Sequence, residues 1–198
     1  MSRLLLVRHA PTASTRQARF PTTCGVRAAD GCEPLDRAGA EQAAALKAVL
    51  PRADYCWASF AVRALQTAQL AGLEAEPDAD LAECDFGHWA GLLPAEVGDP
   101  DALAVWYADP DSAPHRGESF AGVRARAAKV LQRAREAGGT VIAVTHGGLV
   151  RAALVEALGL GPDARWRIEA APASVTELHP ASDGWRIVRV NWTPGALR

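Results

Sequence analysis

Two histidines, His9 and His146, each lie two residues after an apolar run that the sequence predicts to be a buried strand. The runs are 4–7 and 140–144, and the chain has only five histidines. Ligands of α/β sheets bind beyond the carboxyl ends of the strands, so we expect the two imidazoles to meet at one edge of the sheet. A neutral imidazole is a competent nucleophile when its other ring nitrogen is held by a partner. The pattern therefore favours group transfer.

Charged side chains accompany these histidines. Arg8 precedes the first of them, and Arg63 lies one turn into the helical segment after a predicted strand at 55–59. Glu83 lies in the loop that follows this β-α unit. Arginine forks match phosphate oxygens in pairs, and phosphoryl transfer depends mostly on positioning and charge. We therefore predict metal-free phosphoryl transfer, in which Glu83 protonates the leaving alcohol.

Each of these residues also has an ordinary structural interpretation. A single His after a strand is more often structural than catalytic, Arg63 could be a solvated helix residue, and Glu83 an ordinary loop acid. The conjunction carries the prediction, because two buried strands are not expected to end in His by composition alone. In the predicted site, His146 lies across the phosphate and donates to an oxygen, and Gly147 and Gly148 permit close approach of the backbone.

The elements that must position these residues alternate along the chain. Apolar runs predict strands at 4–7, 55–59 and 140–144, and a terminal hairpin at 174–178 and 185–191. Composition and capping residues predict helices at 37–50, 61–70, 101–108, 119–137 and 149–158, with a long loop at 10–35. Strands alternating with helices predict an α/β sheet covered on both faces.

Composition sets the outer limits. With 198 residues, 49% of them hydrophobic, we expect a single compact domain over 1–198. A net charge of −2 gives no basic field for nucleic acid, and no apolar stretch reaches membrane-spanning length. Four cysteines without a C-x-x-C pair predict reduced thiols in the cytoplasm: Cys24, Cys32, Cys56 and Cys84.

Six blocks, in order along the chain, resemble the histidine phosphatase (phosphoglycerate mutase-like) superfamily, and the chain is identified as a member. The first block has Arg8-His9 close to the N-terminus and the last has Val144-Thr-His146-Gly-Gly148. Between them lie 35–43, 58–68 with its Arg, 81–91 with its Glu, and Gly117-Glu118-Ser119. Together the blocks cover most of the segment from 3 to about 155.

The resemblance implies a three-layer α/β/α sandwich with a mostly parallel mixed sheet and one antiparallel edge strand in the tail. It implies that His9 accepts the phosphoryl group and that Glu83 donates the proton. Arg8, Arg63 and His146 would form the rest of the phosphate pocket. No cofactor and no metal are expected, and the expected partner is a small-molecule phosphate ester, with neither nucleic acid nor membrane.

The sequence departs from the family pattern near the first histidine. The usual Gly after that histidine is Ala10, and Pro11 stands where an acidic residue is usual. The family often has an Asn that touches the phosphate a few residues on; Thr15 is the nearest counterpart, and its hydroxyl can donate. We include Thr15 and Gly147 among the expected phosphate-binding residues.

The substrate is less constrained than the chemistry. The short chain favours hydrolysis over mutase activity, and 85–89 together with 106–119 resemble the small phosphatase branch, which includes alpha-ribazole phosphatases of cobalamin synthesis. We expect pocket walls from 10–33 and 86–116. Phe20, Trp89 and Trp106 are candidates to contact an apolar leaving group, or to lie in the core instead.

Three alternatives remain open at this point. A metal hydrolase could use His9, His146, Glu83 and Asp85 as ligands, although two arginines in the same pocket would repel a divalent ion. A phosphate-binding module without activity would need neither a nucleophile nor an acid. A phosphoglycerate mutase-type phosphotransferase is the third. A homodimer is possible, but the faces that might associate cannot be distinguished in the sequence.

Overall fold

The computed structural model describes residues 2–22 and 33–194, and its described part is built on a six-stranded sheet. The strand order is β3-β2-β4-β1-β5-β6. Neighbours in β3, β2, β4 and β1 pair in parallel, whereas β5 is antiparallel to both β1 and β6. The strands are β1 (Arg3–Arg8), β2 (Tyr55–Ala58), β3 (Glu76–Pro77), β4 (Thr140–Thr145), β5 (Val175–Ala181) and β6 (Gly184–Trp192).

The terminal hairpin is confirmed, but its place in the sheet differs from the expectation. The antiparallel strand β5 lies inside the sheet beside β1, and β6, which runs in the same direction as β1, forms the edge. β5 occupies the flank of β1 opposite β4. The chain returns to the sheet from the carboxyl ends of the parallel strands. The first strand of the hairpin, β5, therefore runs antiparallel to β1.

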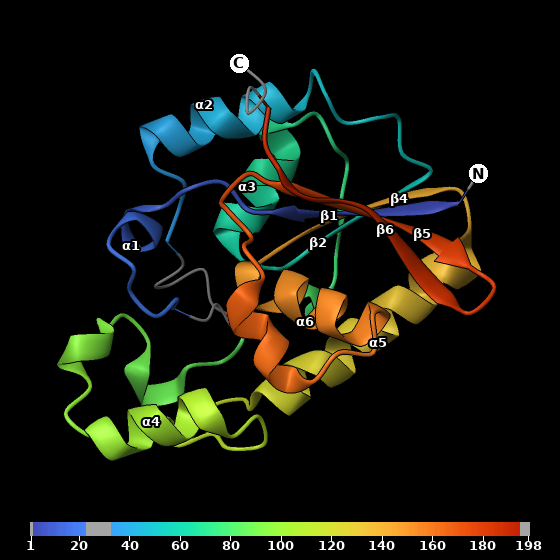
Figure 1. Ribbon diagram of the computed structural model, residues 1–198. Helices are drawn as coiled ribbons and strands as arrows, with labels where there is room; N and C mark the ends of the chain where they lie inside the picture. The colour runs from blue at the N-terminus through green and yellow to red at the C-terminus, as the bar shows by residue number, and fades with distance from the viewer. Residues whose placement is uncertain (1, 23–32, 195–198) are drawn as a thin grey trace.

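Helices cover both faces of the sheet, which confirms the three-layer α/β/α sandwich. Figure 1 shows α2 (Arg37–Leu46) and α3 (Val62–Leu70) on one face and α5 (Phe120–Ala137) and α6 (Gly147–Ala157) on the other. The short α4 (Pro100–Ala108) lies beside the carboxyl ends of the strands, away from the layers. The remaining helical segments are α1 (Ala13–Arg16) and the 3-10 turns Ala79–Leu81, Gly87–Trp89, Pro94–Glu96 and Pro162–Arg167.

The alternation of side chains along β1 divides the core in two. Leu4 and Leu6 pack into the cluster that includes residues of α5 and α6, whereas Leu5 and Val7 pack into the cluster under α2 and α3. All four are at least 96% buried. A strand buried on both faces reads as a continuous apolar run in the sequence, and this run fixes the strand whose end carries the first histidine.

Polar caps and glycines set the helix ends close to the predicted positions. The Asp36 side chain accepts from the Gly39 backbone N–H at the start of α2, and the Ser119 side chain accepts from that of Gly122 at the start of α5. Gly138, at φ 67°, ends α5. No helix in the described ranges combines the length and hydropathy that crossing a bilayer requires.

Candidate phosphoryl-transfer site

The structure brings the two histidines together at the carboxyl ends of two neighbouring central strands. In β1 and β4, which pair in parallel, Arg8 lies opposite Thr145, so the residues that follow, His9 and His146, are neighbours. Their ring centroids are 5.1 Å apart, edge to face. β2 pairs with β4 on its other side and ends just before Ser59, and it delivers α3 to the same place.

His9 is held as a neutral imidazole with a defined tautomer. Its Nδ1 lies 2.7 Å from the backbone oxygen of Ala10. A carbonyl only accepts, so Nδ1 carries the proton and Nε2 carries the lone pair. Burial, and then the charges of Arg63 and Arg8, hold the pKa of His9 well below its usual value. The ring lines the pocket, and Nε2 makes no hydrogen bond with a described residue.

His146 is fully buried and its two ring nitrogens both have partners. Nε2 lies 2.8 Å from Ser59 Oγ, and Nδ1 lies 3.3 Å from Arg63 Nη2. The guanidinium only donates, so Nδ1 accepts and Nε2–H donates to the serine. Burial, followed by the charge of Arg63, holds the pKa of His146 well below its usual value. In this arrangement the ring orients Arg63, and the predicted donation from His146 to a phosphate oxygen stays a prediction.

The two arginines come from different elements and converge on the histidines. Arg63, in the first turn of α3, is 98% buried and donates to the Thr22 carbonyl at 3.3 Å. Arg8 Nη1 donates to the Ala170 carbonyl at 2.5 Å. The Nε of each arginine is buried without a hydrogen-bond partner among the described residues. Burial lowers the pKa of both guanidinium groups, so two desolvated cations face the pocket with donors to spare.

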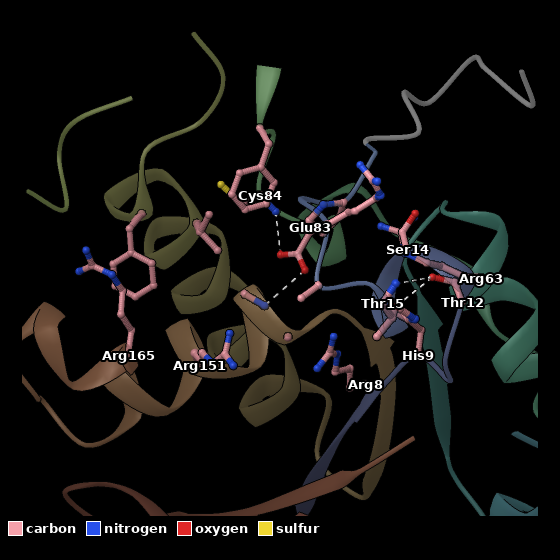
Figure 2. A pocket seen from close by; sticks show the side chains of 18 of the residues that line it. Arg8, His9, Thr12, Ser14, Thr15, Arg63, Glu83, Cys84, Arg151 and Arg165 are labelled. Carbon is pink, nitrogen blue, oxygen red and sulfur yellow. Dashed lines mark hydrogen bonds between the residues drawn. The ribbon is translucent and has the colours of Figure 1, made fainter. Parts of the chain in front are cut away.

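Glu83 enters the pocket from the side opposite Arg8, as Figure 2 shows. Its Oε1 accepts from the Cys84 backbone N–H at 2.9 Å, and its Oε2 from that of Gly148 at 3.4 Å. Gly148 lies in the first turn of α6, and a Cβ at this position would overlap the Glu83 carboxylate. The carboxylate can occupy this place only because residue 148 has no side chain.

A partly buried ion pair holds the segment that carries Glu83. Arg126, on α5, makes a two-pronged pair with Glu118, with distances of 2.8 Å from Nε to Oε1 and 2.7 Å from Nη2 to Oε2. Its Nη1 donates to the carbonyls of Asp80 and Ala82 at 2.8 Å each, and its Nη2 donates to that of Glu83 at 3.4 Å. We call these contacts the Arg126 clamp. The clamp fixes the backbone from which the carboxylate extends.

Backbone and hydroxyl donors complete the rim. Thr15 lies in α1 and lines the pocket; its hydroxyl is 2.9 Å from that of Thr12, whose side chain caps this helix. Gly147 is the first residue of α6, where the free backbone N–H groups and the helix dipole favour an anion. A Cβ at Gly147 would lie 3.2 Å from Arg8 Nε. All the predicted site residues except His146 therefore line this pocket, and His146 contacts two that do, His9 and Arg63.

The pocket has a volume of about 360 Å³ and an aromatic wall that the sequence predicted only in part. Trp106 lines it as expected, with Phe86, Phe120 and Trp166. Phe20 and Trp89 instead belong to the core, where they stack on each other at 5.4 Å.

Arg151 and Arg165 line the end of the pocket away from His9 (Figure 2), and the sequence analysis did not predict either of them. Arg151 lies four residues after Gly147 on the same helix, so helical spacing could have indicated it.

Among the described residues, neither an activated thiol nor a metal-binding group of side chains lies near the site. Cys84 lines the pocket, but burial, together with the charge of Glu83, raises the pKa of its thiol. Cys84 and Cys56 are free thiols, whereas Cys24 and Cys32 lie outside the described residues, as does the part 23–32 of the wall predicted at 10–33. Within residues 2–22 and 33–194, no three His, Cys, Asp or Glu side chains are grouped to hold a metal ion.

A neutral imidazole, two guanidinium groups and a carboxylate therefore lie around one pocket at the carboxyl ends of the central strands. Residues 4–193 match the model of the histidine phosphatase superfamily (branch 1), so the chain belongs to this family. It is 29% identical over 204 residues to phosphoserine phosphatase 1 of Hydrogenobacter thermophilus, covering 98% of this chain and 93% of that protein.

Other relatives are longer than the part that matches. A bifunctional protein of Mycobacterium tuberculosis is 32% identical over 204 residues, which cover 96% of this chain and 53% of that protein. A glucosyl-3-phosphoglycerate phosphatase of the same organism is 32% identical over 145 residues, 67% of this chain and 61% of the relative. The chain thus spans only about half to three fifths of these relatives.

Solved structures agree with the fold. The mycobacterial glucosyl-3-phosphoglycerate phosphatase in complex with VO3 superposes with a TM-score of 0.82 at 29% identity, covering 98% of this chain and all of that chain. A phosphoserine phosphatase variant from Entamoeba histolytica reaches 0.86 over the full length of both chains, and at 22% identity this similarity supports the fold alone.

Proposed function

We propose that this chain hydrolyses phosphate monoesters of small metabolites through a phosphohistidine on His9. The observation that carries the proposal is the environment of that ring. Its Nδ1 proton is bound by the Ala10 carbonyl, its Nε2 makes no hydrogen bond with a described residue, and the buried Arg63 and the partly buried Arg8 lie beside it. A neutral nucleophile next to surplus buried positive charge suits attack on a bound dianion.

The binding step uses the unpaired donors. Arg8 and Arg63 each retain a buried Nε–H without a partner among the described residues, and an incoming phosphoryl group would satisfy both. The N-terminal turn of α6 at Gly147 and the hydroxyl of Thr15 add neutral donors at the same rim. Phosphate binding thereby offsets the cost of burying two like charges.

The chemical step follows from the two sides of the pocket. His9 Nε2 attacks phosphorus, the bond to the ester oxygen breaks, and protonated Glu83 gives its proton to this oxygen, so a neutral alcohol leaves. Water then attacks the phosphohistidine while the Glu83 carboxylate takes its proton, which releases inorganic phosphate and restores both groups. General acid catalysis of this kind contributes about 10²- to 10⁴-fold.

The size and lining of the pocket support a small-molecule substrate. A volume of about 360 Å³ with an aromatic wall accommodates the phosphoryl group and a leaving group of metabolite size. The relatives support the same class, since they are named for phosphoserine and for glucosyl-3-phosphoglycerate.

The test is release of inorganic phosphate from a panel of phosphomonoesters in the presence of a chelator. We expect turnover by the wild type, inhibition by vanadate and loss of turnover in His9→Ala. We expect Glu83→Gln to slow alkyl phosphates far more than aryl phosphates, because only poor leaving groups need the proton. Full inhibition by the chelator, with recovery on adding a divalent metal, would favour a metal hydrolase instead. Exchange of phosphate between glycerate positions without release to water would favour a mutase.

A further inference from the structure

The pocket extends beyond the phosphate site to a further cationic side chain whose charge the proposed reaction does not use. Arg151, on α6, lines the pocket beside Arg8, and the charge of Arg151 contributes to lowering the pKa of Arg8. Figure 2 shows both guanidinium groups on the floor of the pocket below Glu83, with Arg151 on the side away from His9.

The other arginine at this end, Arg165, has a structural explanation. Its Nη atoms donate to the carbonyls of Pro162 and Tyr107 at 3.0 Å, and the group lies 4.6 Å from the centre of the Phe120 ring and 4.8 Å from that of Trp166. These contacts tie Arg165 to the aromatic wall and leave it little capacity for a ligand.

Arg151 is different, because only one of its donors is used by the described residues. Its Nε donates to the Ile168 carbonyl at 3.0 Å, and this bond fixes the orientation of the side chain. The two Nη groups make no hydrogen bond or ion pair with a described residue. With Nε occupied, the parallel N–H bonds at the end of the fork remain free, and they match the two oxygens of a carboxylate.

We propose that Arg151 binds a carboxylate of the leaving group, so that the preferred substrates are phosphate esters of hydroxy acids. This inference rests on the proposed function, because it assumes that Arg8, Arg63 and His9 hold the phosphoryl group. One guanidinium supplies a single positive charge, which balances a carboxylate and falls short of a second phosphate dianion. A neutral leaving group would leave this charge unmatched.

A matched pair of substrates isolates the carboxylate. 3-Phosphoglycerate and glycerol 3-phosphate share the carbon skeleton and the primary ester, and they differ by a carboxylate in place of a hydroxymethyl group. We expect the wild type to prefer 3-phosphoglycerate by about 10- to 100-fold in kcat/KM, the range of one charge-assisted pair. Arg151→Met should abolish the preference by raising KM for 3-phosphoglycerate alone, and Arg151→Lys should retain part of it.

Two controls separate this subsite from the rest of the site. Arg167→Met removes one exposed arginine that does not line the pocket and should leave both substrates unchanged. p-Nitrophenyl phosphate, which has no carboxylate, reports whether the phosphate pocket survives in each variant. Activity of Arg151→Met on this ester comparable to wild type shows that the link through Ile168 is not needed for the chemistry.

Three results would overturn the proposal. The first is a wild type that hydrolyses p-nitrophenyl phosphate without preferring 3-phosphoglycerate; the phosphatase function would then stand and the subsite would fail. The second is an equal loss of both glycerol esters in Arg151→Met. The third is a preference confined to a bisphosphate over its monophosphate, which would assign Arg151 to a second phosphoryl group. No turnover of any ester would instead refute the proposed function.

Discussion

Gly148→Ala should impair proton donation by Glu83 and leave the other groups of the proposed site in place. The added Cβ would overlap Glu83 Oε1 and lie 3.3 Å from Cδ. The nearest atoms all belong to the Glu83 carboxylate, so this group has to move. Restoring an ordinary carbon–oxygen separation requires the carboxylate to retreat by about 1 Å. The main chain is held by the Arg126 clamp, so the displacement falls on the side chain. The variant should therefore bind phosphate normally and deliver the proton poorly.

The expected size follows from that displacement. Misplacing a reacting group by about 1 Å costs about 100-fold, or ~2.7 kcal/mol in the barrier. We expect this loss in kcat for an alkyl phosphate and less than about 3-fold for p-nitrophenyl phosphate, whose leaving group needs no proton. Steady-state kinetics on both esters measures the difference. The helix itself should not suffer, since Ala is better than Gly in a helix by about 1 kcal/mol.

Two other glycine substitutions serve as controls. At Gly161 a Cβ meets nothing within 4 Å, so Gly161→Ala should behave as wild type. At Gly147 the Cβ would lie 3.2 Å from Arg8 Nε, so Gly147→Ala should affect both esters alike through the phosphate pocket. If Gly148→Ala slows both esters equally, or neither, the assignment of Glu83 as the acid is refuted.

Two further predictions concern stability and the Arg126 clamp. The folded-state pKa values of His9 and His146 lie well below 6.5, so unfolding takes up protons, and the free energy of unfolding should fall as pH drops below about 6.5, by up to ~1.4 kcal/mol per pH unit for each ring. Urea denaturation at several pH values gives the free energy of unfolding as a function of pH, and this free energy should fall less steeply with decreasing pH in His9→Gln than in the wild type. The same pH dependence in both proteins would contradict the burial argument. Arg126→Gln should lower kcat about 10-fold for alkyl phosphates with little change for aryl phosphates or in KM. A double-mutant cycle with Glu118→Gln should show coupling, and additive effects would argue against the clamp.

Local patterns were sufficient to predict the parts of the fold that carry the chemistry. The runs behind His9 and His146 are buried on both faces and read as continuous apolar segments, so their ends were visible in the sequence. Capping residues such as Asp36 and Ser119 marked the helix starts. Functional groups at such boundaries are positioned by short-range structure, which sequence reasoning handles best.

Features that depend on pairing between distant segments were not predictable in the same way. β3 is only two residues long and includes Pro77, so it has no periodicity to detect. α1 is a four-residue helix inside the predicted loop, marked only by its cap at Thr12. The insertion of β5 between β1 and β6 depends on the return path of the chain.

The same limit applies inside the site. Trp89 and Trp106 have the same residue type, and only the packing sends one to the core and the other to the pocket wall. The hydrogen bond that His146 Nε2–H donates to Ser59 joins residues 87 positions apart, and it occupies the one proton that the ring could donate to a ligand. Side-chain tautomers and partners of this kind follow from three-dimensional contacts that no spacing in the sequence encodes.

The central claim is a covalent bond between phosphorus and His9 Nε2, and rapid acid-free quenching with a radiolabelled phosphate ester tests it most directly. Wild type should acquire label that is lost in acid and stable in base, as a phosphoramidate is, and peptide mapping should place it at residue 9. Glu83→Gln should accumulate more of this label, because the water that resolves the intermediate loses its base. Turnover by the wild type without any such label, or label that persists in His9→Ala, would contradict the account.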